Sequence, residues 1–366
     1  MAVYKIFAAA DATLYSAYPE DNTGLDEILE VASQNSDVPS DILNDGISDD
    51  LRRAVIQFSN TDLQTAYALV SGSTWASNLR LYLATATNLN TLYSIEVRQV
   101  SQSWEMGTGK FMDEPATKNG VCWYTTSSYV GAVTGSTNWV GAQYLNTPGG
   151  GSWTNTFTTQ SFGYKDNKDI NVNVTPLVTN WLTGSQANNG FLVKLPLSVE
   201  RDSGSYIGLK FFSIDTHTIY PPTLEFKWDD AVYNTGSLSV ISNSNTVITI
   251  GNNAGQFKND TSKYIFRVSA RDKYPARAFI TSSVYTTNKA LPSSSYWALE
   301  DAKTGERVID FDTIYTKISC DSNGSYFPIY MNGLEPERFY KILIKTNLAT
   351  GEIVDIDNNI MFKLVR

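Results

Sequence analysis

Apolar and polar residues alternate in short runs along most of this chain, which is the pattern of half-buried β-strands. Residues 53–58 alternate cleanly, and residues 79–83 and 95–100 repeat the pattern. A helical pattern is confined to short stretches such as residues 63–69. The hydrophobic pattern therefore predicts an all-β protein.

One segment combines three predicted elements. Alternation in residues 170–174 predicts a strand. Thr175 stands at an N-cap position, Pro176 at the first helical position and Gly184 at the end, which predicts a helix of about two turns. The Asn-Asn-Gly sequence in residues 188–194 predicts a turn that leads into a second strand.

The sequence pattern changes at Asp229 and Asp230, and we place a domain boundary there. Residues 1–229 form the first expected domain. Residues 230–366 contain short apolar runs that predict an immunoglobulin-like β-sandwich, at 238–241, 246–250, 264–268, 296–299, 326–330, 339–344 and 360–364. A Leu-x-Pro turn before Tyr340 indicates a tyrosine corner, with an ordinary loop as the alternative.

Residues 101–162 form a long excursion rich in Gly, Ser and Thr, and it interrupts the first domain. Long loops are usually functional or docked against a neighbour. The candidate contact residues in it are Trp104, Trp123, Trp139 and Trp153. Exposed rings would stack on sugars. We instead expect them to anchor the loop on the sandwich or on a neighbouring subunit, because a loop with few aliphatic side chains needs something to bury.

Composition and charge exclude several classes of protein. The net charge is −9 with no cluster of basic residues, so a nucleic acid is a poor partner. No run of 18 apolar residues could span a membrane, and the N-terminus reads as a strand rather than a signal peptide. Cys122 and Cys320 lie far apart, so we predict two buried free thiols in a chain that folds in a reducing cytoplasm.

Candidate catalytic residues are few. His217 is the single histidine, and with Asp215 it could belong to a Ser-His-Asp arrangement, but no Gly-x-Ser-x-Gly sequence accompanies it. We predict a structural histidine and no cofactor. The acid pair Asp310 and Asp312 would share one face of a strand, for which a solvated edge is a simpler interpretation than a glycosidase pair.

Two groups of oxygen-bearing side chains are weak candidates for calcium, and neither follows the EF-hand pattern. The first group joins residues 21–22 with residues 26–27. The second group consists of Asp355, Asp357 and Asn358. For both groups we expect a solvated surface rather than a metal site.

Six motifs occur in an order that resembles a known family: Asp11-Ala-Thr, Asn22-Thr-Gly24, Arg53-Ala-Val-Ile-Gln-Phe58, Asn78-Leu-Arg-Leu-Tyr-Leu83, Ser103-Trp104 with Pro115-Ala-Thr117, and Val174-Thr-Pro-Leu-Val-Thr-Asn-Trp181 followed by Asn189-Gly-Phe191. On these motifs the first 228 residues or so resemble the DNRLRE-type β-sandwich family. The resemblance implies a jelly-roll-like β-sandwich, followed here by the immunoglobulin-like one. Members are often secreted domains that bind polysaccharide or stud large surface proteins, and this chain departs from them in its long excursion and in lacking a signal peptide.

The junction between the two domains reads Thr218-Ile-Tyr-Pro-Pro-Thr-Leu-Glu-Phe-Lys-Trp-Asp-Asp230. With this junction, the two-domain layout is similar to structural proteins of marine T4-like phages. That resemblance implies a non-enzymatic virion component of a tail, neck, collar or fibre, made in the host cytoplasm. Its expected partners are other virion proteins and copies of itself. The alternative is a carbohydrate-binding adhesin that recognises a host surface polysaccharide, and a polysaccharide depolymerase ranks below both.

Overall fold

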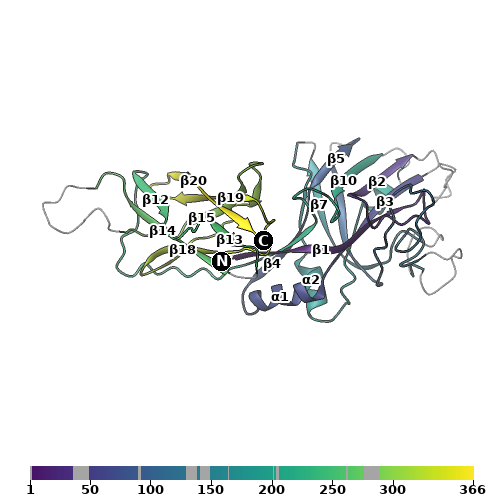
Figure 1. Ribbon diagram of the computed structural model, residues 1–366, viewed down its shortest axis with the longest axis horizontal. Helices are drawn as coiled ribbons and strands as arrows, with labels where there is room; N and C mark the ends of the chain where they lie inside the picture. The colour runs from purple at the N-terminus through teal and green to yellow at the C-terminus, as the bar shows by residue number, and fades with distance from the viewer. Residues whose placement is uncertain are drawn as a thin grey trace. The chain divides into compact units, whose positions relative to one another are not determined.

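The computed structural model describes residues 2–35, 49–89, 92–128, 138–140, 149–163, 165–200, 202, 206–260, 263–275 and 288–366. Strands hold 48% of the residues and helices 7%, so the protein is all-β, as the alternation predicts. The strands form several mainly antiparallel sheets (Figure 1).

The chain divides into two compact units. The N-terminal unit consists of Ile6–Leu69 and Ala76–Glu225. The C-terminal unit consists of Phe226–Arg366 together with two short segments, Met1–Lys5 and Val70–Trp75. The predicted boundary at 229 lies close to the main division, but the sequence pattern did not indicate that the two short segments belong with the C-terminal residues.

The N-terminal unit is built on one connected set of eleven strands. Their order is β5-β10-β2-β3-β1-β11-β4-β8, and β9 joins β3 to β6, which in turn pairs with β7. The strands are β1 (Ala2–Tyr15), β2 (Ile28–Asn35), β3 (Asp49–Phe58), β4 (Trp75–Leu81), β5 (Leu83–Thr87), β6 (Leu92–Val100), β7 (Trp153–Gly163), β8 (Ile170–Asn173), β9 (Phe191–Lys194), β10 (Ile207–Phe212) and β11 (Thr223–Trp228). Strand β3 is central, because it pairs with β1, β2 and β9.

Three helices accompany these strands: α1 (Asn60–Val70), α2 (Thr175–Leu182) and α3 (Leu197–Glu200). The predicted short helix around residues 63–69 is α1. The predicted two-turn helix is α2, and Gly184 follows its end with a φ of 74°, the conformation that glycine adopts most easily.

The predicted N-cap of α2 is wrong by one residue. Val174 holds the N-cap position and has no side-chain capping bond. The hydroxyl of Thr175 instead accepts a hydrogen bond from the Ser77 N–H at 2.8 Å. The Asn173 side chain accepts one from the Thr175 N–H at 3.0 Å, so local and cross-strand partners replace the cap.

The last ten residues of the predicted excursion, 153–162, belong to a regular strand. Strand β7 pairs antiparallel with β6 over almost its whole length, from Leu92 opposite Gly163 to Val100 opposite Trp153. The irregular part is therefore shorter than expected, and the described residues between 101 and 152 contain no named strand or helix.

The C-terminal unit is β-sandwich-like. One sheet has the order β12-β14-β18-β17, and the other has the order β13-β20-β19-β15-β16. The strands are β12 (Thr246–Ile250), β13 (Gln256–Lys258), β14 (Lys263–Asp272), β15 (Ser295–Asp301), β16 (Arg307–Ile309), β17 (Ser319–Asp321), β18 (Gly324–Tyr330), β19 (Phe339–Asn347) and β20 (Ile353–Val365).

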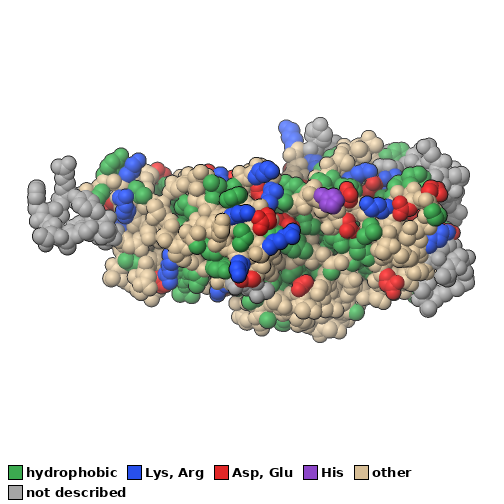
Figure 2. Space-filling view, in the orientation of Figure 1, with side chains coloured by type: hydrophobic (Ala, Val, Ile, Leu, Met, Phe, Trp, Pro, Cys, Tyr) green, Lys and Arg blue, Asp and Glu red, His purple; other side chains and the backbone are tan. Residues whose placement is uncertain are grey.

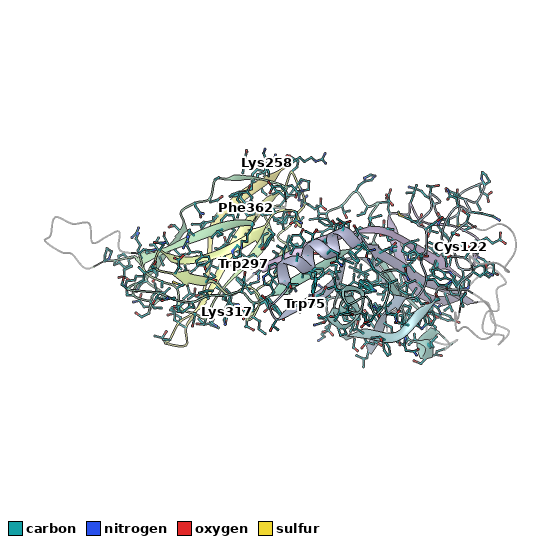
Figure 3. The ribbon with its side chains drawn as sticks, turned by 90° about the horizontal axis from the view of Figure 1, so that it is seen from below. Trp75, Cys122, Lys258, Trp297, Lys317 and Phe362 are labelled. Atoms are coloured by element: carbon teal, nitrogen blue, oxygen red, sulfur yellow. The ribbon has the colours of Figure 1, made fainter. Side chains whose placement is uncertain are left out.

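The core of the C-terminal unit lies between its two sheets. Trp297 of β15 stacks on Phe327 of β18 at 5.1 Å between ring centroids, and Phe266 of β14 meets Phe362 of β20 at 5.6 Å. Figure 3 labels Trp297 and Phe362 among the strands of this unit. Side chains from both sheets thus share one apolar cluster.

Two detailed expectations for this unit have opposite outcomes. The tyrosine corner is confirmed, because the Tyr340 hydroxyl donates a 2.9 Å hydrogen bond to the Glu335 carbonyl five residues upstream. The predicted strand at residues 238–241 is wrong, since the structure has only an isolated bridge there between Val240 and Ala290.

Replacing the corner hydroxyl should destabilise the C-terminal unit. We expect Tyr340→Phe to lower the free energy of unfolding by about 1–2 kcal/mol, because the partly buried Glu335 carbonyl loses its donor. Native-state hydrogen exchange of the β19 amides measures this change. Tyr274→Phe is the matched control, since Tyr274 is 75% exposed, and the two variants should not behave alike.

Candidate functional site

The tryptophans proposed as contact residues pack inside the N-terminal unit. Trp123 and Trp139 are each 2% exposed and Trp104 is 7% exposed, while Trp153 is partly buried. They form one apolar cluster with side chains of β1, β3 and β9: Ala12, Leu14, Leu51, Val55 and Leu192. The rings therefore anchor the excursion on the sheet, and in this arrangement Trp104, Trp123 and Trp139 do not offer a stacking face to a sugar or a neighbouring subunit.

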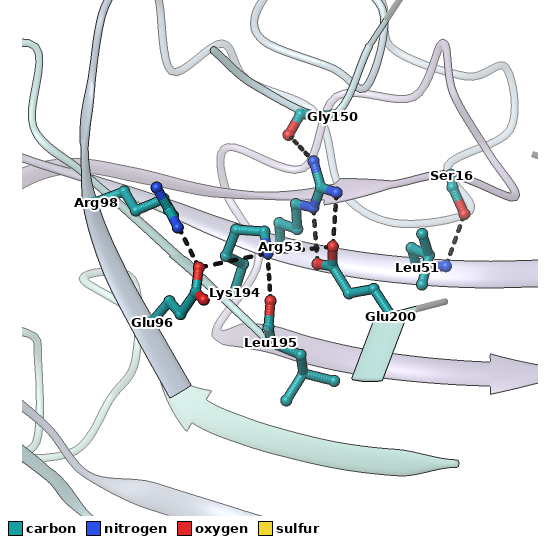
Figure 4. Close-up of polar contacts among 9 residues, drawn as sticks. All are labelled: Ser16, Leu51, Arg53, Glu96, Arg98, Gly150, Lys194, Leu195 and Glu200. Atoms are coloured by element: carbon teal, nitrogen blue, oxygen red, sulfur yellow. Dashed lines mark hydrogen bonds and ion pairs between the residues drawn. The ribbon is translucent and has the colours of Figure 1, made fainter. Parts of the chain in front are cut away.

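A buried ion network lies beneath these rings (Figure 4). Arg53 of β3 donates two hydrogen bonds to the Glu200 carboxylate, at 3.0 and 2.9 Å, and a third to the Gly150 carbonyl at 2.6 Å. The Lys194 ammonium lies 3.2 Å from the same carboxylate. Arg53 and Lys194 are 0% exposed, so both charges depend on these partners.

Burial and charge pairing act against each other in the network. Burial lowers the pKa of Lys194 to about 8, although the Glu200 carboxylate favours the charged form. Burial would raise the pKa of Glu200, but the charges of Arg53 and Lys194 outweigh it and the pKa is lowered. The guanidinium of Arg53 also lies 5.1 Å from the Trp123 ring centroid, so it ties the excursion to β3.

Two glycines let the excursion approach this network. A Cβ on Gly149 would meet Trp123 Cδ1 at 2.5 Å, and a Cβ on Gly150 would meet Arg53 Nη1 at 2.6 Å. Both glycines also have a positive φ, 138° and 75°. The Gly-Gly-Gly tract at 149–151 is thus the sequence signal of a close approach to buried side chains.

Asn22 is an important residue whose role the sequence did not reveal. Its side chain is fully buried and bonds to four backbone groups: its amide donates to the Met106 and Val121 carbonyls, and its carbonyl accepts from the Gly24 and Gly109 N–H groups. We call this arrangement the Asn22 clamp. It fastens residues 106–121 to the turn after β1, where the sequence suggested only a turn or a calcium ligand.

The other sequence candidates lie apart from this region. His217 is exposed, and Figure 2 shows the single histidine at the surface. Cys122 and Cys320 are buried free thiols, as predicted. Asp310 and Asp312 follow β16 rather than sharing a strand face, and the Asp312 carboxylate accepts the Ile314 and Tyr315 N–H groups.

The weak calcium candidates at the C-terminus have protein partners. Asp355 lies 3.8 Å from Lys345, and Asp357 lies 3.0 Å from Lys341. The Asn358 side chain donates to the Ile248 carbonyl. Within the described ranges, no three His, Cys, Asp or Glu side chains converge in a way that could hold a metal ion.

Strand β7 presents one edge without a partner strand among the strands that the structure describes. Its sequence has neither charge nor proline, and Phe157 is 46% exposed. Near one end the Gln160 side chain bonds to the backbone of Asp169 and Asn171, which ties that end to the start of β8. Native edge strands usually carry charges or proline to prevent pairing with another chain, and this strand carries neither.

Comparisons with known proteins do not assign a family to the chain. No protein-family model matches the sequence, and no curated protein does so. In the part of the chain with assigned structure, no helix is long and apolar enough to cross a membrane. The functional argument therefore depends on the geometry of the molecule.

Disrupting the ion network should destabilise the N-terminal unit strongly. We expect Arg53→Ala to lower the free energy of unfolding by about 3–5 kcal/mol, because the buried Glu200 carboxylate would lose its main partner and the Gly150 carbonyl its donor. Urea unfolding followed by tryptophan fluorescence measures the change. Lys118→Ala removes the exposed Lys118–Glu20 pair of the same unit and should have no measurable effect; equal effects of the two variants would contradict this account.

A second group of buried acids makes stability depend on pH. Asp11 of β1 is 1% exposed and accepts the Ile214 N–H at 2.9 Å. Burial raises its pKa to about 8, and the charges of Asp215 and Asp26 act in the same direction. Burial also raises the pKa of Asp26 to about 6. The folded unit therefore holds protons that the unfolded chain releases near pH 4.

The sign of the pH dependence follows from these raised values. The contribution of Asp11 and Asp26 to the free energy of unfolding is largest below about pH 4. It falls as the pH rises toward 8, because in that window the two carboxyl groups ionise freely only in the unfolded chain. We expect the wild type to lose a few kcal/mol between pH 5 and pH 8. Asp11→Asn should remove most of that loss, whereas Asp62→Asn on exposed α1 should retain it. Urea unfolding at pH 5 and pH 8 measures this difference. If Asp11→Asn lost as much free energy of unfolding between the two pH values as the wild type does, the account would be wrong.

Proposed function

We propose that this protein is a non-enzymatic structural component of a tailed bacteriophage virion, in the tail, neck, collar or fibre. In this proposal the N-terminal unit is a DNRLRE-type, jelly-roll-like sandwich and the C-terminal unit is an immunoglobulin-like sandwich. The chain is made in the host cytoplasm and acts through contacts with other virion proteins and with its own copies. The order of the sequence motifs supports a place in a virion, and the geometry of the N-terminal unit supports assembly through protein contacts.

The observation that carries the assembly role is the edge of β7. Eleven residues without charge or proline would be a hazard in a protein that remains alone, because such an edge pairs with other strands. In a subunit of a large particle the same edge is useful. A strand of a neighbouring subunit can continue the sheet and satisfy the backbone groups, as in β-strand addition.

One face of β7 also carries a partly exposed aromatic ring, that of Phe157. The guanidinium of Arg98 lies 4.1 Å from the centroid of the Phe157 ring and is itself held by Glu96 at 2.8 Å. The ring is therefore fixed from one side and exposed on the other. A rigid, partly exposed aromatic ring is a common anchor of protein interfaces.

The geometry favours assembly over the adhesin that was considered as an alternative. That alternative depended on exposed tryptophans in the excursion, and Trp104, Trp123 and Trp139 are packed against the sheet. Their burial supports a rigid loop region around the ion network. A glycan site in the N-terminal unit would have to use other residues.

The direct test is to look for the protein in particles. Antibodies against the purified chain, used for immunogold electron microscopy of virions purified from the host lysate, should label the tail, neck, collar or fibre. Mass spectrometry of the same particles should find the chain at a fixed copy number. Purified particles that lack both label and peptides would refute the proposal.

Charges placed on the β7 edge should block assembly without affecting folding. We expect Asn155→Lys with Thr159→Lys to reduce incorporation into particles about tenfold, because lysines on an edge strand oppose pairing. Quantitative mass spectrometry of particles formed with the variant supplied in trans measures this. The control, Gln64→Lys with Ala68→Lys, makes the same charge change on the exposed side of α1 and should be incorporated normally. Equal incorporation of both variants would exclude β7 as the contact.

A further inference from the structure

A small open pocket lies on the five-stranded sheet of the C-terminal unit. Its volume is about 170 Å³. Lys341, Leu343 and Lys345 of β19 alternate with Tyr340, Ile342 and Ile344, which belong to the core, so the first three face outward. The pocket is lined by Glu300, Arg307, Phe311, Leu343, Ile344, Asp355, Ile356 and Asp357. The charged side chains of the lining place the pocket on the outer side of the sheet, although Ile344 and Ile356 also pack with the sandwich core.

An aromatic ring forms one part of the pocket. The Arg307 guanidinium lies 4.9 Å from the Phe311 ring centroid, and the Lys345 ammonium lies 5.1 Å from it. These two cations keep the ring in place. Leu343 lies in the same pocket but is only 7% exposed, so the partly exposed Phe311 ring is the main apolar part of the lining.

A row of alternating charges crosses four strands beside this ring. Lys341 of β19 lies 3.0 Å from Asp357 of β20 and 2.8 Å from Glu300 of β15. Glu300 in turn lies 3.7 Å from Arg307 of β16. We call this row the charge ladder. The hydrogen bonds that Lys341 donates to Glu300 and Asp357 raise the pKa of Lys341, and the bond to Asp357 lowers the pKa of that carboxyl group, so Lys341 and Asp357 stay ionised.

The pairing of charges determines which ligand suits the pocket. Each acid of the lining has a basic partner, since Lys345 also lies 3.8 Å from Asp355. An ionic ligand would have to break one of these pairs. A neutral ligand with many hydroxyls would not, because carboxylate oxygens accept hydrogen bonds from hydroxyls and guanidinium groups donate them without losing their own partners.

Two ion pairs have room to adjust to such a ligand. The Arg307–Glu300 and Lys345–Asp355 separations of 3.7 and 3.8 Å exceed normal hydrogen-bond lengths. The side chains of Arg307 and Lys345 are also 41% and 33% exposed. Their N–H groups can therefore turn toward hydroxyls of a bound molecule. The tight Lys341 pairs form the fixed side of the site.

Size restricts the ligand further. Pockets for drug-sized molecules hold about 300–1,000 Å³, and this one is smaller. It suits a single ring with one apolar face and a polar rim. A pyranose has this shape, with C–H groups that can lie on Phe311 and hydroxyls around its edge.

We propose that the pocket binds one neutral sugar ring, as a unit of a surface polysaccharide. Phe311 contacts the apolar face of the ring, and the charge ladder hydrogen-bonds its hydroxyls. This site lies in the C-terminal unit, so it is independent of β7 and of the proposed assembly role. A virion protein with such a pocket would contact glycan as well as neighbouring subunits.

Methyl NMR of the full-length chain tests the proposal. The methyl signals of Leu343, whose side chain lines the pocket, report directly on it. We expect neutral sugars such as glucose, galactose, mannose and N-acetylglucosamine, added singly and as oligosaccharides, to shift these signals for at least one sugar with a Kd near 1 mM, the strength of a small, open site. Glucuronic acid and glucosamine serve as charged comparators and should bind more weakly.

Variants separate the pocket from non-specific effects. Phe311→Ala should weaken binding about tenfold. Asp357→Asn should also weaken it, since the amide loses one hydroxyl acceptor and the strong pair with Lys341. Tyr274→Ala removes an exposed aromatic ring elsewhere in the same unit and should bind as the wild type does. Because Phe311 follows β16 at the surface, an unchanged methyl shift of Ile329, a core residue of the other sheet, would show in the unbound variant that the fold is intact.

The outcomes that overturn the proposal are equally specific. Absence of shifts with every neutral sugar at tens of millimolar, preference for a charged comparator, or unchanged binding in Phe311→Ala would each reject a neutral-sugar site. None of these outcomes would bear on the virion role, which is tested by the labelling of particles and by the β7 variants.

Discussion

The N-terminal unit depends on one buried ion pair, between Arg53 and Glu200. A guanidinium without access to water is tolerated only if its donors are satisfied, and here the carboxylate and the Gly150 carbonyl satisfy them. Arg53 belongs to the central strand β3, Gly150 to the excursion and Glu200 to α3, so these hydrogen bonds join the three parts of the unit. The Glu200 carboxylate also serves as the counter-charge of Lys194, and the Arg53 guanidinium packs against the Trp123 ring. The position of the excursion follows from the need to enclose this charge.

The two units manage charge in different ways. In the N-terminal unit charges are inside, and apolar rings cover them. In the C-terminal unit the core is aromatic and aliphatic, the buried Asp301 pairs with Arg338, and the charge ladder lies outside the core. Figure 2 shows acidic and basic side chains interspersed on the visible face. The first arrangement specifies where a loop must dock, and the second leaves a patterned surface that can meet a polar ligand.

Local patterns in the sequence predicted local structure well. Alternation predicted most strands, and the Leu-x-Pro sequence before Tyr340 predicted its corner because the bond spans only five residues. The cap of α2 was misplaced because the Thr175 hydroxyl bonds to Ser77, 98 residues away. Strands of three residues, such as β16, are too short to show alternation.

The candidate sites were harder to predict for the same reason. Asn22 looks like an ordinary turn residue, and its role depends on backbone groups about 85 to 100 residues away. The tryptophans were recognised as anchors, but their counterpart Arg53 read only as part of a strand. The pocket draws residues from four strands and a loop, and no spacing in the sequence brings them together.

The neutral edge of β7 has a consequence for the environments in which the protein can assemble. Contacts between charged surfaces weaken as salt rises, since the Debye length falls from about 10 Å at 0.1 M to about 3 Å at 1 M. Strand pairing through β7 would use backbone hydrogen bonds and threonine methyl groups, which salt does not screen. A particle joined in this way would keep its subunits together as readily in seawater as in the cytoplasm of its host.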